Sequence, residues 1–373
     1  MTENKKWEII ISGGGTAGHL MPGISVANAL VEQEVVSDSK KIHFVGSRRE
    51  IEKKLVTEAG FTLTQLPGNG IQRRLSLKNF GSVLGLVFAT NQATFSLLTK
   101  RPKIVISLGG YASAPATIAS ILLRIPLILM EQNATPGLAN RIFARFAKVN
   151  IVAFENTGLN KAVNLGNPVR QEFISLTEAV EREEVRNSLG VNEEMLILVF
   201  GGSLGAQQIN KAVKEFVESW DSERLVVHHV IGKRDFADEM CRASHPSPQV
   251  DYRPVEYENE MPKMMTCADL VICRAGATTV AEVALVGLPA IFVPLPNAPG
   301  DHQTLNAQAL CSNGAGVLLS NKELNGKRLS EEVNRLVSDK EELKAMADFA
   351  KELGRPKAAS DIANLIKDLS GGK

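Results

Sequence analysis

The sequence predicts an α/β fold made of two doubly wound, parallel-sheet domains. Three segments carry this prediction, because each places a short apolar run before glycines and a helical pattern. They are "WEIIISGGGTAGH" from Trp7, "KIVISLGGYASAPA" from Lys103 and "MLILVFGGSLGAQQIN" from Met195. A continuous apolar strand that leads into a helix is typical of a parallel sheet covered on both faces. The first and third segments start about half a chain apart, and 373 residues are more than one core usually holds, so we expect two Rossmann-like domains.

The remaining elements follow in chain order. Further strands are expected at 41–46, 127–130 and 149–154 in the first half, and at 225–232, 269–273 and 289–294 in the second. Helical patterns lie between them, so both halves repeat the strand and helix alternation of a parallel sheet.

Turn-forming residues mark the expected domain boundaries. The Gly-Asn-Pro in "NLGNPVRQEF" (164–173) breaks both helix and strand and suits a hinge. A polar helix over 177–190 then leads into the second sheet, and two helices at the end of the chain are separated by Gly354, Arg355 and Pro356. We therefore expect an N-terminal domain, a C-terminal domain and a last helix that crosses back onto the first domain, at 1–165, 166–355 and 356–373.

Composition and charge narrow the classes of function. A formal net charge of +1 argues against a nucleic-acid-binding surface. The four cysteines include no C-x-x-C pair and are expected to be reduced core thiols, with a metal site unfavoured. The N-terminus lacks a signal-peptide core, and the longest apolar run, 118–130, is interrupted and too short to span a bilayer. We expect a cytoplasmic protein unless something else tethers it to a membrane.

The first glycine loop suggests a phosphate site. Gly13, Gly15 and Gly18 fit G-x-G-x-x-G, which is typical of dinucleotide binding, although such turns also simply pack a helix on a strand. A dinucleotide site needs an acidic residue at the end of the second strand. The sequence has Arg48 and Arg49 there, which weakens NAD and leaves NADP as a second choice.

The second half contains a more specific pattern. "DLVICRAGATTVAEVALVGLPAIFVP" places a strand, Gly276 and two threonines before a helix with Glu282. Backbone N–H groups of Ala277 to Thr279 and a threonine hydroxyl can bind a pyrophosphate, and the Glu282 carboxylate can accept from both hydroxyls of a ribose. The alternative is a threonine-capped helix with a solvated glutamate. The pattern favours a nucleoside diphosphate site.

Seven motifs in this order resemble the MurG family over nearly the whole chain. They are "GGGTAGHLMPG", "SLGGYASAP", "EQNATPGLANR", "GNPVR", "GGSLGAQQIN", "CRAGATTVAE" and "DHQTLNA". The resemblance implies the GT-B fold, with two domains facing across a cleft, the acceptor in the N-terminal domain and the nucleotide sugar mainly in the C-terminal one. It implies an inverting glycosyltransferase of peptidoglycan biosynthesis, and hence of cell shape and cell division. Such an enzyme moves N-acetylglucosamine from UDP-N-acetylglucosamine to the 4-hydroxyl of the muramyl sugar of lipid I, giving lipid II.

The resemblance also implies the donor contacts. They are expected from Thr16, Ala17, Gly18, Asn133, Arg170, Ser203, Tyr257, Glu258, Ala277, Thr278, Thr279, Val280, Ala281, Glu282, His302 and Gln303. Of these, Tyr257 or Glu258 would lie near uracil. Arg170 and Arg274 are cations available to the leaving phosphates, and no Asp-x-Asp occurs in the chain. We therefore expect no cofactor and no metal, with helix dipoles and hydrogen bonds stabilising the departing UDP.

His19 is the first candidate for the catalytic base. An inverting transfer needs a base for the proton of the acceptor hydroxyl, and the ordinary pKa of histidine, about 6.5, suits that role. Alternatively His19 binds a phosphate at the helix start. Glu131 in "EQN" is the competing base. Acceptor contacts are expected from Gly13, Gly14 and Gly15, which would hold its pyrophosphate or frame the cleft, and from Tyr111.

A lipid-linked acceptor requires contact with a membrane. "GIQRRLSLKNFGSVLGLVF" (70–88) interleaves apolar residues with cations, which suits an anionic membrane surface, and Arg141, Arg145 and Lys148 would extend it. The alternative is an ordinary buried helix with a charged rim. The expected location is peripheral, on the cytoplasmic side of the cell membrane, with cell-wall synthesis proteins as further partners.

Other functions stay open at this point. A different GT-B enzyme, such as a glycolipid synthase or a UDP-sugar epimerase, would share the diphosphate contacts and differ at the acceptor. An NADP-dependent oxidoreductase is favoured only by the first glycine loop and Arg48. A membrane-recruiting subunit that binds a nucleotide sugar for a partner would not need His19 or both half-sites.

Overall fold

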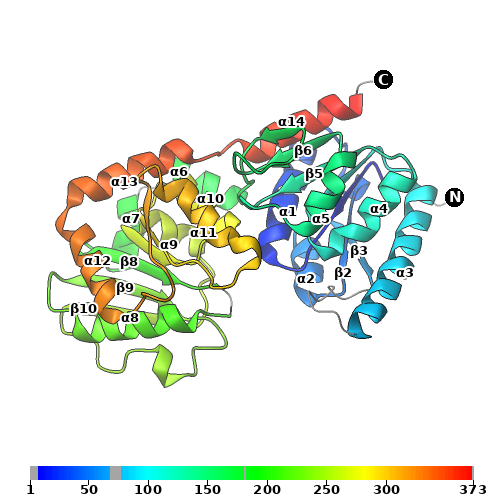
Figure 1. Cartoon of the computed structure of the whole chain (residues 1–373). Coiled ribbons are helices and arrows are strands. Elements are labelled where there is room, and N and C mark those ends of the chain that lie inside the picture. The colour runs from blue at the N-terminus through cyan, green and yellow to red at the C-terminus, as the bar shows by residue number, and fades with distance from the viewer. Residues whose placement is uncertain (1–6, 68–76, 180–181, 203, 372–373) are drawn as a thin grey trace. The chain divides into compact units, whose positions relative to one another are not determined.

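The chain divides into two compact units. The computed structural model describes residues 7–67, 77–179, 182–202 and 204–371. Unit 1 comprises Met1–Arg170 and Pro356–Lys373, and unit 2 comprises Gln171–Arg355, as Figure 1 shows by colour along the chain. The sequence placed the boundary five residues earlier, at 165/166.

Unit 1 is built on a seven-stranded parallel sheet. Its order is β3-β2-β1-β4-β5-β6-β7, so the first strand lies in the middle and the chain winds outward in both directions. The strands are β1 (Ile9–Ser12), β2 (Ile42–Ser47), β3 (Thr62–Leu66), β4 (Ile104–Ser107), β5 (Leu127–Glu131), β6 (Val149–Val152) and β7 (Ala162–Asn164). The inner strands β1, β4 and β5 are buried throughout because helices cover both faces of the sheet.

Two groups of helices cover this sheet. One core lies under α1 (Ala17–Glu32), α2 (Glu50–Glu58) and α14 (Ala358–Gly371). The core on the other face lies under α3 (Leu77–Lys100), α4 (Ala114–Leu122), α5 (Leu138–Phe143) and the 3-10 turn Ala144–Phe146. Because the strands are parallel, the loops after β1, β4 and β5 all lie at the carboxyl edge of the sheet.

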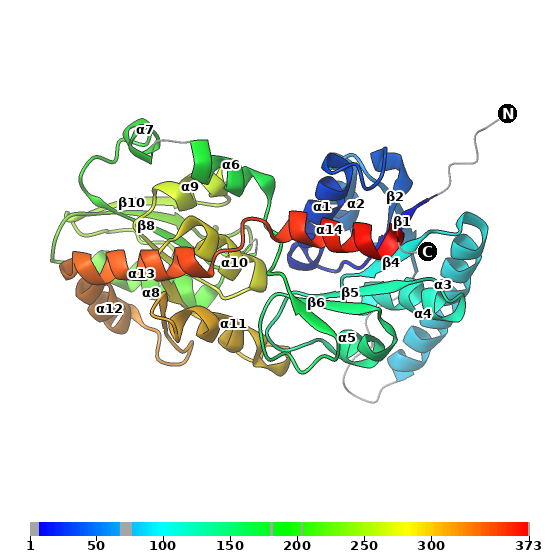
Figure 2. The ribbon, with the colours of Figure 1, turned by 90° about the horizontal axis from the view of Figure 1, so that it is seen from above.

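The last helix, α14, returns to the first unit. Ile362, Ala363 and Ile366 are buried in the same core as residues of α1, and Gln33 Nε2 donates to Ser360 Oγ at 2.8 Å. Figures 1 and 2 both draw α14 alongside α1. The C-terminal segment is thus an integral part of the unit that the N-terminal half of the chain builds.

Unit 2 repeats the architecture with six parallel strands in the order β10-β9-β8-β11-β12-β13. The strands are β8 (Met195–Phe200), β9 (Leu225–Val230), β10 (Val250–Val255), β11 (Leu270–Cys273), β12 (Ala290–Phe292) and β13 (Gly316–Leu318). The helices are α6 (Gln171–Ala179), α7 (Arg182–Ser188), α8 (Gln207–Ser219), α9 (Met261–Cys267), α10 (Ala277–Val286), α11 (His302–Cys311), α12 (Gly326–Ser338) and α13 (Lys340–Leu353). The predicted polar helix over 177–190 corresponds to the end of α6 and to α7. The expected α/β fold with two doubly wound parallel sheets is confirmed.

Candidate active site

The first glycine loop joins β1 to α1. Gly13, Gly14 and Gly15 have positive φ angles of 152°, 155° and 92°. A Cβ on Gly13 would lie 2.6 Å from the Leu108 Cβ, and one on Gly14 would lie 2.4 Å from the Glu52 Cδ. Side chains of the protein itself therefore require glycine at these two positions. An acceptor-binding role of the three glycines stays a prediction.

The start of α1 presents the candidate base. Thr16 is the N-cap residue, and Thr16, Ala17 and Gly18 are exposed, whereas the His19 side chain is half-buried. The Thr16 hydroxyl contacts His19 Nδ1 at 2.9 Å. A hydroxyl can accept as well as donate, and when Nδ1–H donates to Thr16 the other nitrogen, Nε2, carries the lone pair that a base needs.

Glu131, the competing base, is enclosed by donors. Its side chain is 4% exposed. One carboxylate oxygen accepts from the Asn133 amide at 3.0 Å and from Asn133 Nδ2 at 3.3 Å, and the other accepts from the Gly137 amide at 3.0 Å and from Asn140 Nδ2 at 2.8 Å. These four hydrogen bonds hold the loop after β5, which presents Asn133.

The loops after β1, β4 and β5 converge. Gly109 and Gly110 have φ angles of 79° and 75°. A Cβ on Gly109 would lie 2.8 Å from Asn140 Nδ2, and one on Gly110 would lie 3.6 Å from the Gly14 carbonyl oxygen. Tyr111 follows, and its hydroxyl makes a long contact, 3.5 Å, with the Ser82 carbonyl of α3. The predicted residues at 13–19, 111 and 131–133 thus share the carboxyl edge of one sheet, where ligands of such folds bind.

In unit 2, α10 begins shortly after β11. Gly276 is the N-cap, so the amides of Ala277 to Thr279 lie at the N-terminus of the helix. Thr278 and Thr279 are half-buried and Glu282 is buried. Burial raises the pKa of the Cys273 thiol, and the Glu282 carboxylate contributes a further increase, so Glu282 lies close to the end of β11. The expected alternative of a solvated glutamate does not describe this side chain.

Three loops beside α10 are cross-linked. Arg274 Nη1 donates to the Val293 and Pro294 carbonyls and to Asn321 Oδ1, at 2.8 to 2.9 Å, and burial lowers the pKa of this guanidinium. Gln303 Oε1 accepts from the Leu295 amide at 2.9 Å.

The start of α11 belongs to the same cluster. Asn306, buried in α11, donates to the Ala275 carbonyl at 3.2 Å, and His302 Nδ1 donates to the Pro299 carbonyl at 2.9 Å. Together with the contacts of Arg274 and Gln303, these bonds gather Arg274, His302 and Gln303 around the start of α10. Their donor contacts stay predictions.

The loop between β8 and α8 lies over a buried polar cluster. Ser203, a predicted donor ligand, lies outside the described residues. Asn210 donates to the Ile231 carbonyl and to Asp235 Oδ2, both at 3.1 Å, and His229 Nε2 faces Asn210 Oδ1 at 3.1 Å. Burial lowers the pKa of His229 to about 3, with a smaller contribution from His228. A neutral His229 therefore holds α8 against β9.

The loop expected near uracil is tied to β9. Glu258 accepts from the Glu260 amide at 2.7 Å and faces His228 Nε2 at 2.9 Å. Burial lowers the pKa of His228, which Glu258 partly offsets. Tyr257 is exposed. Of the two predicted contacts, Tyr257 is the one whose side chain is open to a ligand.

Arg170 is the last residue of unit 1 and directly precedes α6. Its predicted contact with the donor stays a prediction.

Sequence reasoning missed four residues that shape these loops, namely Glu52, Asn140, Asn210 and Asn306. Each is buried. Glu52, Asn210 and Asn306 bond to residues 37, 21 and 31 positions away, and Asn140 bonds to Glu131, nine positions away. Asn140, Asn210 and Asn306 fall inside the quoted motifs "EQNATPGLANR", "GGSLGAQQIN" and "DHQTLNA". An amide within an otherwise apolar helix face was the available signal, because a buried amide needs hydrogen-bond partners.

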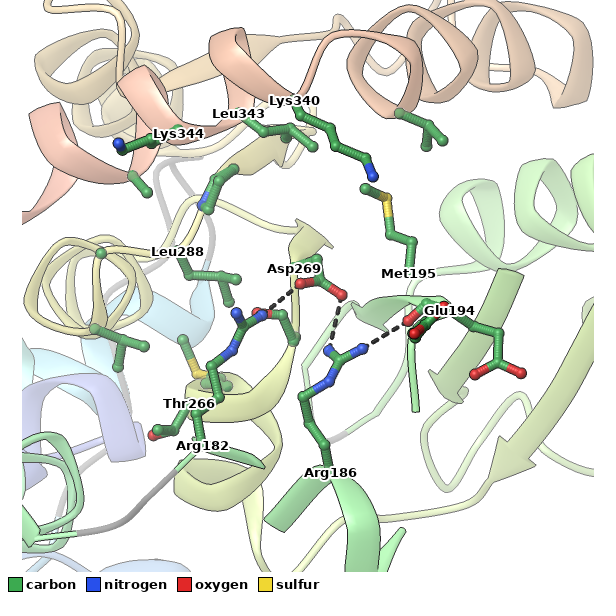
Figure 3. Close-up of a pocket in the computed structure, with 18 of the residues that line it drawn as sticks. Arg182, Arg186, Glu194, Met195, Thr266, Asp269, Leu288, Lys340, Leu343 and Lys344 are labelled. Atoms are coloured by element: carbon green, nitrogen blue, oxygen red, sulfur yellow. Dashed lines mark hydrogen bonds and ion pairs between the residues drawn. The ribbon is translucent and has the colours of Figure 1, made fainter. Parts of the chain in front are cut away.

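A pocket of about 510 Å³ lies at the opposite end of the second sheet. Figure 3 shows the Arg182 and Arg186 guanidinium groups converging on Asp269, with Lys340, Leu343 and Lys344 along another wall. Asp269 Oδ2 also accepts from the Leu196 amide at 2.8 Å, and Arg186 donates to the Glu194 carbonyl at 2.6 Å. This network fastens α7 to the amino ends of β8 and β11, away from the glycine loops.

One face of α3 is apolar and points away from the core. Its inward residues, buried against the sheet, are Ala89, Ala93 and Leu97. Its outward residues are exposed, Phe88 by 64% and Phe95 by 69%, and the others are Val83, Leu84, Val87 and Leu98. On the same face of the sheet, Leu138, Ile142 and Phe146 are exposed as well, and Arg145 lies over the Phe146 ring.

The predicted patch over 70–88 is only partly described. Residues 70–76 and the side chains of 77–80, Phe80 among them, lie outside the described residues. Within the described ranges, the segment Gly81–Lys100 of α3 has the length and composition of a membrane-crossing helix. Core helices of other proteins meet the same two criteria, but only 17% of this window is buried. The outward side of α3 is therefore not an ordinary core face.

Comparisons with known proteins agree with the motifs. Residues 9–151 match the model of the glycosyltransferase family 28 N-terminal domain, and residues 196–362 match that of the glycosyltransferase family 28 C-terminal domain.

Two relatives match over nearly their whole length. The chain is 37% identical over 363 residues to the UDP-N-acetylglucosamine--N-acetylmuramyl-(pentapeptide) pyrophosphoryl-undecaprenol N-acetylglucosamine transferase of Syntrophus aciditrophicus, covering 95% of this chain and 97% of that protein. It is 35% identical to the protein of the same name from Myxococcus xanthus, covering 97% and 93%.

Among solved structures, the chain is similar to that of MurG from Acinetobacter baumannii. The TM-score is 0.77 at 28% identity, over 97% of this chain and 99% of that one. Together with the two parallel sheets and the two matched domains, this likeness confirms the expected GT-B fold class.

Proposed function

Because this chain belongs to the MurG family of glycosyltransferases, we propose that it transfers N-acetylglucosamine from UDP-N-acetylglucosamine to lipid I, giving lipid II. The observation that carries this proposal is the 37% identity to a relative named for that transfer, along 95% of this chain. An epimerase or an NADP-dependent oxidoreductase is not favoured, since relatives that match over nearly the whole chain are named for this transfer.

The test is transfer of radiolabelled N-acetylglucosamine from UDP to a short-chain analogue of lipid I. We expect labelled disaccharide product that depends on both substrates. Consumption of UDP-N-acetylglucosamine without acceptor would instead indicate an epimerase. Binding of NADPH without binding of UDP, measured by ligand titration, would indicate the oxidoreductase.

The donor is assigned mainly to unit 2. The first amides of α10 and the dipole of this ten-residue helix favour the pyrophosphate. The buried Glu282 carboxylate, in the second turn of the same helix, accepts from the ribose hydroxyls, and Tyr257 lies beside uracil. Arg274, His302 and Gln303 complete the donor site, with further contacts from Thr16 to Gly18, Asn133 and Arg170.

Unit 1 is assigned to the acceptor and to the base. His19 is the base, since its side chain is half-buried and not enclosed like that of Glu131, and its Nδ1 contacts the Thr16 hydroxyl. Glu131 serves to hold the loop of Asn133, because four hydrogen bonds already occupy its carboxylate. The glycine loop and Tyr111 contact the acceptor.

The apolar face of α3 binds the cytoplasmic surface of the cell membrane. Its aromatic and aliphatic side chains enter the interface, while Arg141, Arg145 and Lys148 attract anionic lipids. The Phe88→Ser/Phe95→Ser double variant is expected to reduce flotation with anionic vesicles by about tenfold. Phe349→Ser, an exposed phenylalanine of unit 2, is the control. Unchanged flotation of the double variant would contradict the assignment.

Transfer is proposed to proceed without a metal ion. The chain has no Asp-x-Asp. The start of α10, together with Arg170 and Arg274, supplies positive potential at the leaving UDP. Protein treated with EDTA should keep its activity. Loss of activity that magnesium restores through the donor site would contradict this proposal.

A further inference from the structure

Glu52 is a buried carboxylate in the wall of the first glycine loop. It lies in α2, is 1% exposed and accepts three hydrogen bonds. One oxygen accepts from the Gly15 amide at 2.6 Å and from the Ser47 hydroxyl at 2.5 Å, and the other accepts from the Ser47 amide at 2.7 Å. Two backbone amides and a hydroxyl thus fix the position of this carboxylate.

The same helix also holds the carbonyl of Gly15. Arg49, at the N-terminus of α2, donates from Nη1 to the Gly15 oxygen. Gly15 has a φ of 92°, and no atom lies within 4 Å of the place where its Cβ would be. Packing therefore does not impose this conformation, whereas hydrogen bonds to both of its backbone groups do.

The surroundings are shaped to admit the carboxylate. A Cβ on Gly46 would lie 2.2 Å from Glu52 Oε2, and one on Gly14 would lie 2.4 Å from Glu52 Cδ. Gln65 of β3 donates to the Ser47 carbonyl at 3.1 Å and so supports the segment that carries two of the donors. Gly14 after β1 and Gly46 of β2 thus leave space for the Glu52 side chain, and Gln65 of β3 supports its donors.

We infer that Glu52 and Arg49 form a clamp on Gly15 that positions His19 for the transfer. Gly15 directly precedes Thr16, whose hydroxyl contacts the His19 ring, so the two bonds set where α1 begins and where the ring stands. Glu52 is a positioning residue, because it acts through this backbone and does not touch the substrate. The inference rests on the proposed function, and it means that a phosphate at this loop binds amides other than that of Gly15.

Two variants test the clamp. Glu52→Gln leaves a side chain of the same shape but faces at least one of the three donors with an NH₂ group. Arg49→Ala removes the hydrogen bond to the Gly15 carbonyl. Because Arg49 is exposed, this variant is expected to fold. Because small displacements of a catalytic group cost up to about 100-fold, we expect kcat to fall about 10-fold to 100-fold in Glu52→Gln and about 3-fold to 10-fold in Arg49→Ala. The KM for UDP-N-acetylglucosamine should stay within about twofold of its original value.

Two matched controls separate positioning from general stability. Glu8→Gln removes a carboxylate that pairs with Lys41 and Lys103 at the other end of the same sheet. Arg48→Ala removes the neighbouring exposed arginine. Both should keep kcat within about twofold, even where Glu8→Gln lowers the melting temperature. Folded Glu52→Gln and Arg49→Ala proteins with unaltered kcat would overturn the inference, as would losses of kcat in all four variants in proportion to their melting temperatures.

Hydrogen exchange gives a readout that does not depend on transfer. Peptides covering residues 13–20 should exchange faster in Glu52→Gln than in Glu8→Gln, with the rest of unit 1 alike in both. Unchanged exchange in these peptides would overturn the clamp whatever the reaction is. If the unaltered protein failed to transfer sugar while the exchange result held, the proposed function would fail and the clamp would stand.

Discussion

Each sheet carries a buried acid five residues beyond the end of its second strand, and the two acids have different partners. Glu52 follows β2, which ends at Ser47, and Asp235 follows β9, which ends at Val230. Both are 1% exposed. Glu52 accepts from the Gly15 backbone amide, whereas Asp235 pairs with the Arg234 guanidinium at 2.6 and 3.0 Å and accepts from Asn210 of α8.

The difference separates two uses of one position in the fold. In unit 1 the acid is bonded to the glycine loop itself and therefore sets the conformation of the loop. In unit 2 the acid is bonded to a helix side chain, and the loop is shaped by crowding, since a Cβ on Gly205 would lie 2.4 Å from the Ile231 oxygen and 2.6 Å from Asp235 Oδ2. Gly15 of unit 1 is held by hydrogen bonds to Glu52 and Arg49. Gly205 of unit 2 is instead crowded by Ile231 and Asp235, and its amide donates to the Gly202 carbonyl of the same loop at 2.9 Å.

The largest effect is expected on kcat when the proposed base in unit 1 is removed. His19→Ala should lower kcat by about 100-fold to 10,000-fold, the range for loss of a general base, in the lipid I transfer assay. His245→Ala, an exposed histidine of unit 2, should keep full activity. A loss below about tenfold at saturating acceptor would move the role of base to Glu131.

The next effect is expected in donor binding by unit 2. Glu282→Gln removes a charge-assisted acceptor and should weaken UDP binding about 10-fold to 100-fold, measured by calorimetry. Glu331→Gln, an exposed acid of α12, is the matched control. The unaltered protein should bind 2′-deoxy-UDP more weakly than UDP, and Glu282→Gln should bind the two alike. Equal heats for both ligands with the unaltered protein would refute the contact with ribose.

Substitutions that place a Cβ against Glu52 or Asp235 test the comparison directly. Gly14→Ala and Gly205→Ala each place a Cβ against a buried carboxylate, so each should lower the free energy of unfolding by about 2–4 kcal/mol in urea titrations. Only Gly14→Ala should also lower kcat of the folded protein. Gly60→Ala, at a φ of 80° with open space around it, should cost only about 1 kcal/mol. Equal loss of kcat in both loop variants would abolish the distinction.

The smallest effect concerns pH and should be alike in both units. Burial lowers the pKa of His43 in unit 1 to about 4, helped by Lys100, and that of His229 in unit 2 to about 3. Below pH 6.5 the unfolded chain binds protons at these two histidines, whereas the folded chain leaves them neutral. The free energy of unfolding is therefore highest above pH 6.5 and decreases as the pH falls. Urea titrations between pH 6.5 and about 5.5 should show a loss of about 1 kcal/mol for each histidine. A flat profile would contradict the burial of neutral rings.

The sequence revealed the inner strands and missed the edges. The four strands that it did not predict, β3, β7, β10 and β13, are the outer strands of the two sheets. An inner strand is buried on both faces and is continuously apolar, as in "IIIS" and "LVIC". The edge strands are short or mixed in polarity, and β10 contains Pro254, which only an edge tolerates well.

The candidate site divides in the same way. Local spacing identified the glycine loops, which follow strand ends directly, and His19 and Glu282, which lie in the first two turns of the next helices. It could not identify Glu52, whose partner Gly15 is 37 positions away, nor could it reveal that Glu131 is enclosed by Asn133, Gly137 and Asn140. A side chain's partners depend on register and crossovers between elements, which residue spacing alone does not encode.

The return of α14 has a consequence for how the molecule is made. Ile362, Ala363 and Ile366 complete a core whose other residues, such as Ile11 and Leu20, are synthesised first. A ribosome must therefore finish the whole intervening unit before this core can close. The half of the protein that is translated first becomes complete last, and a chain cut short after unit 2 leaves the apolar side of α1 exposed to chaperones and proteases.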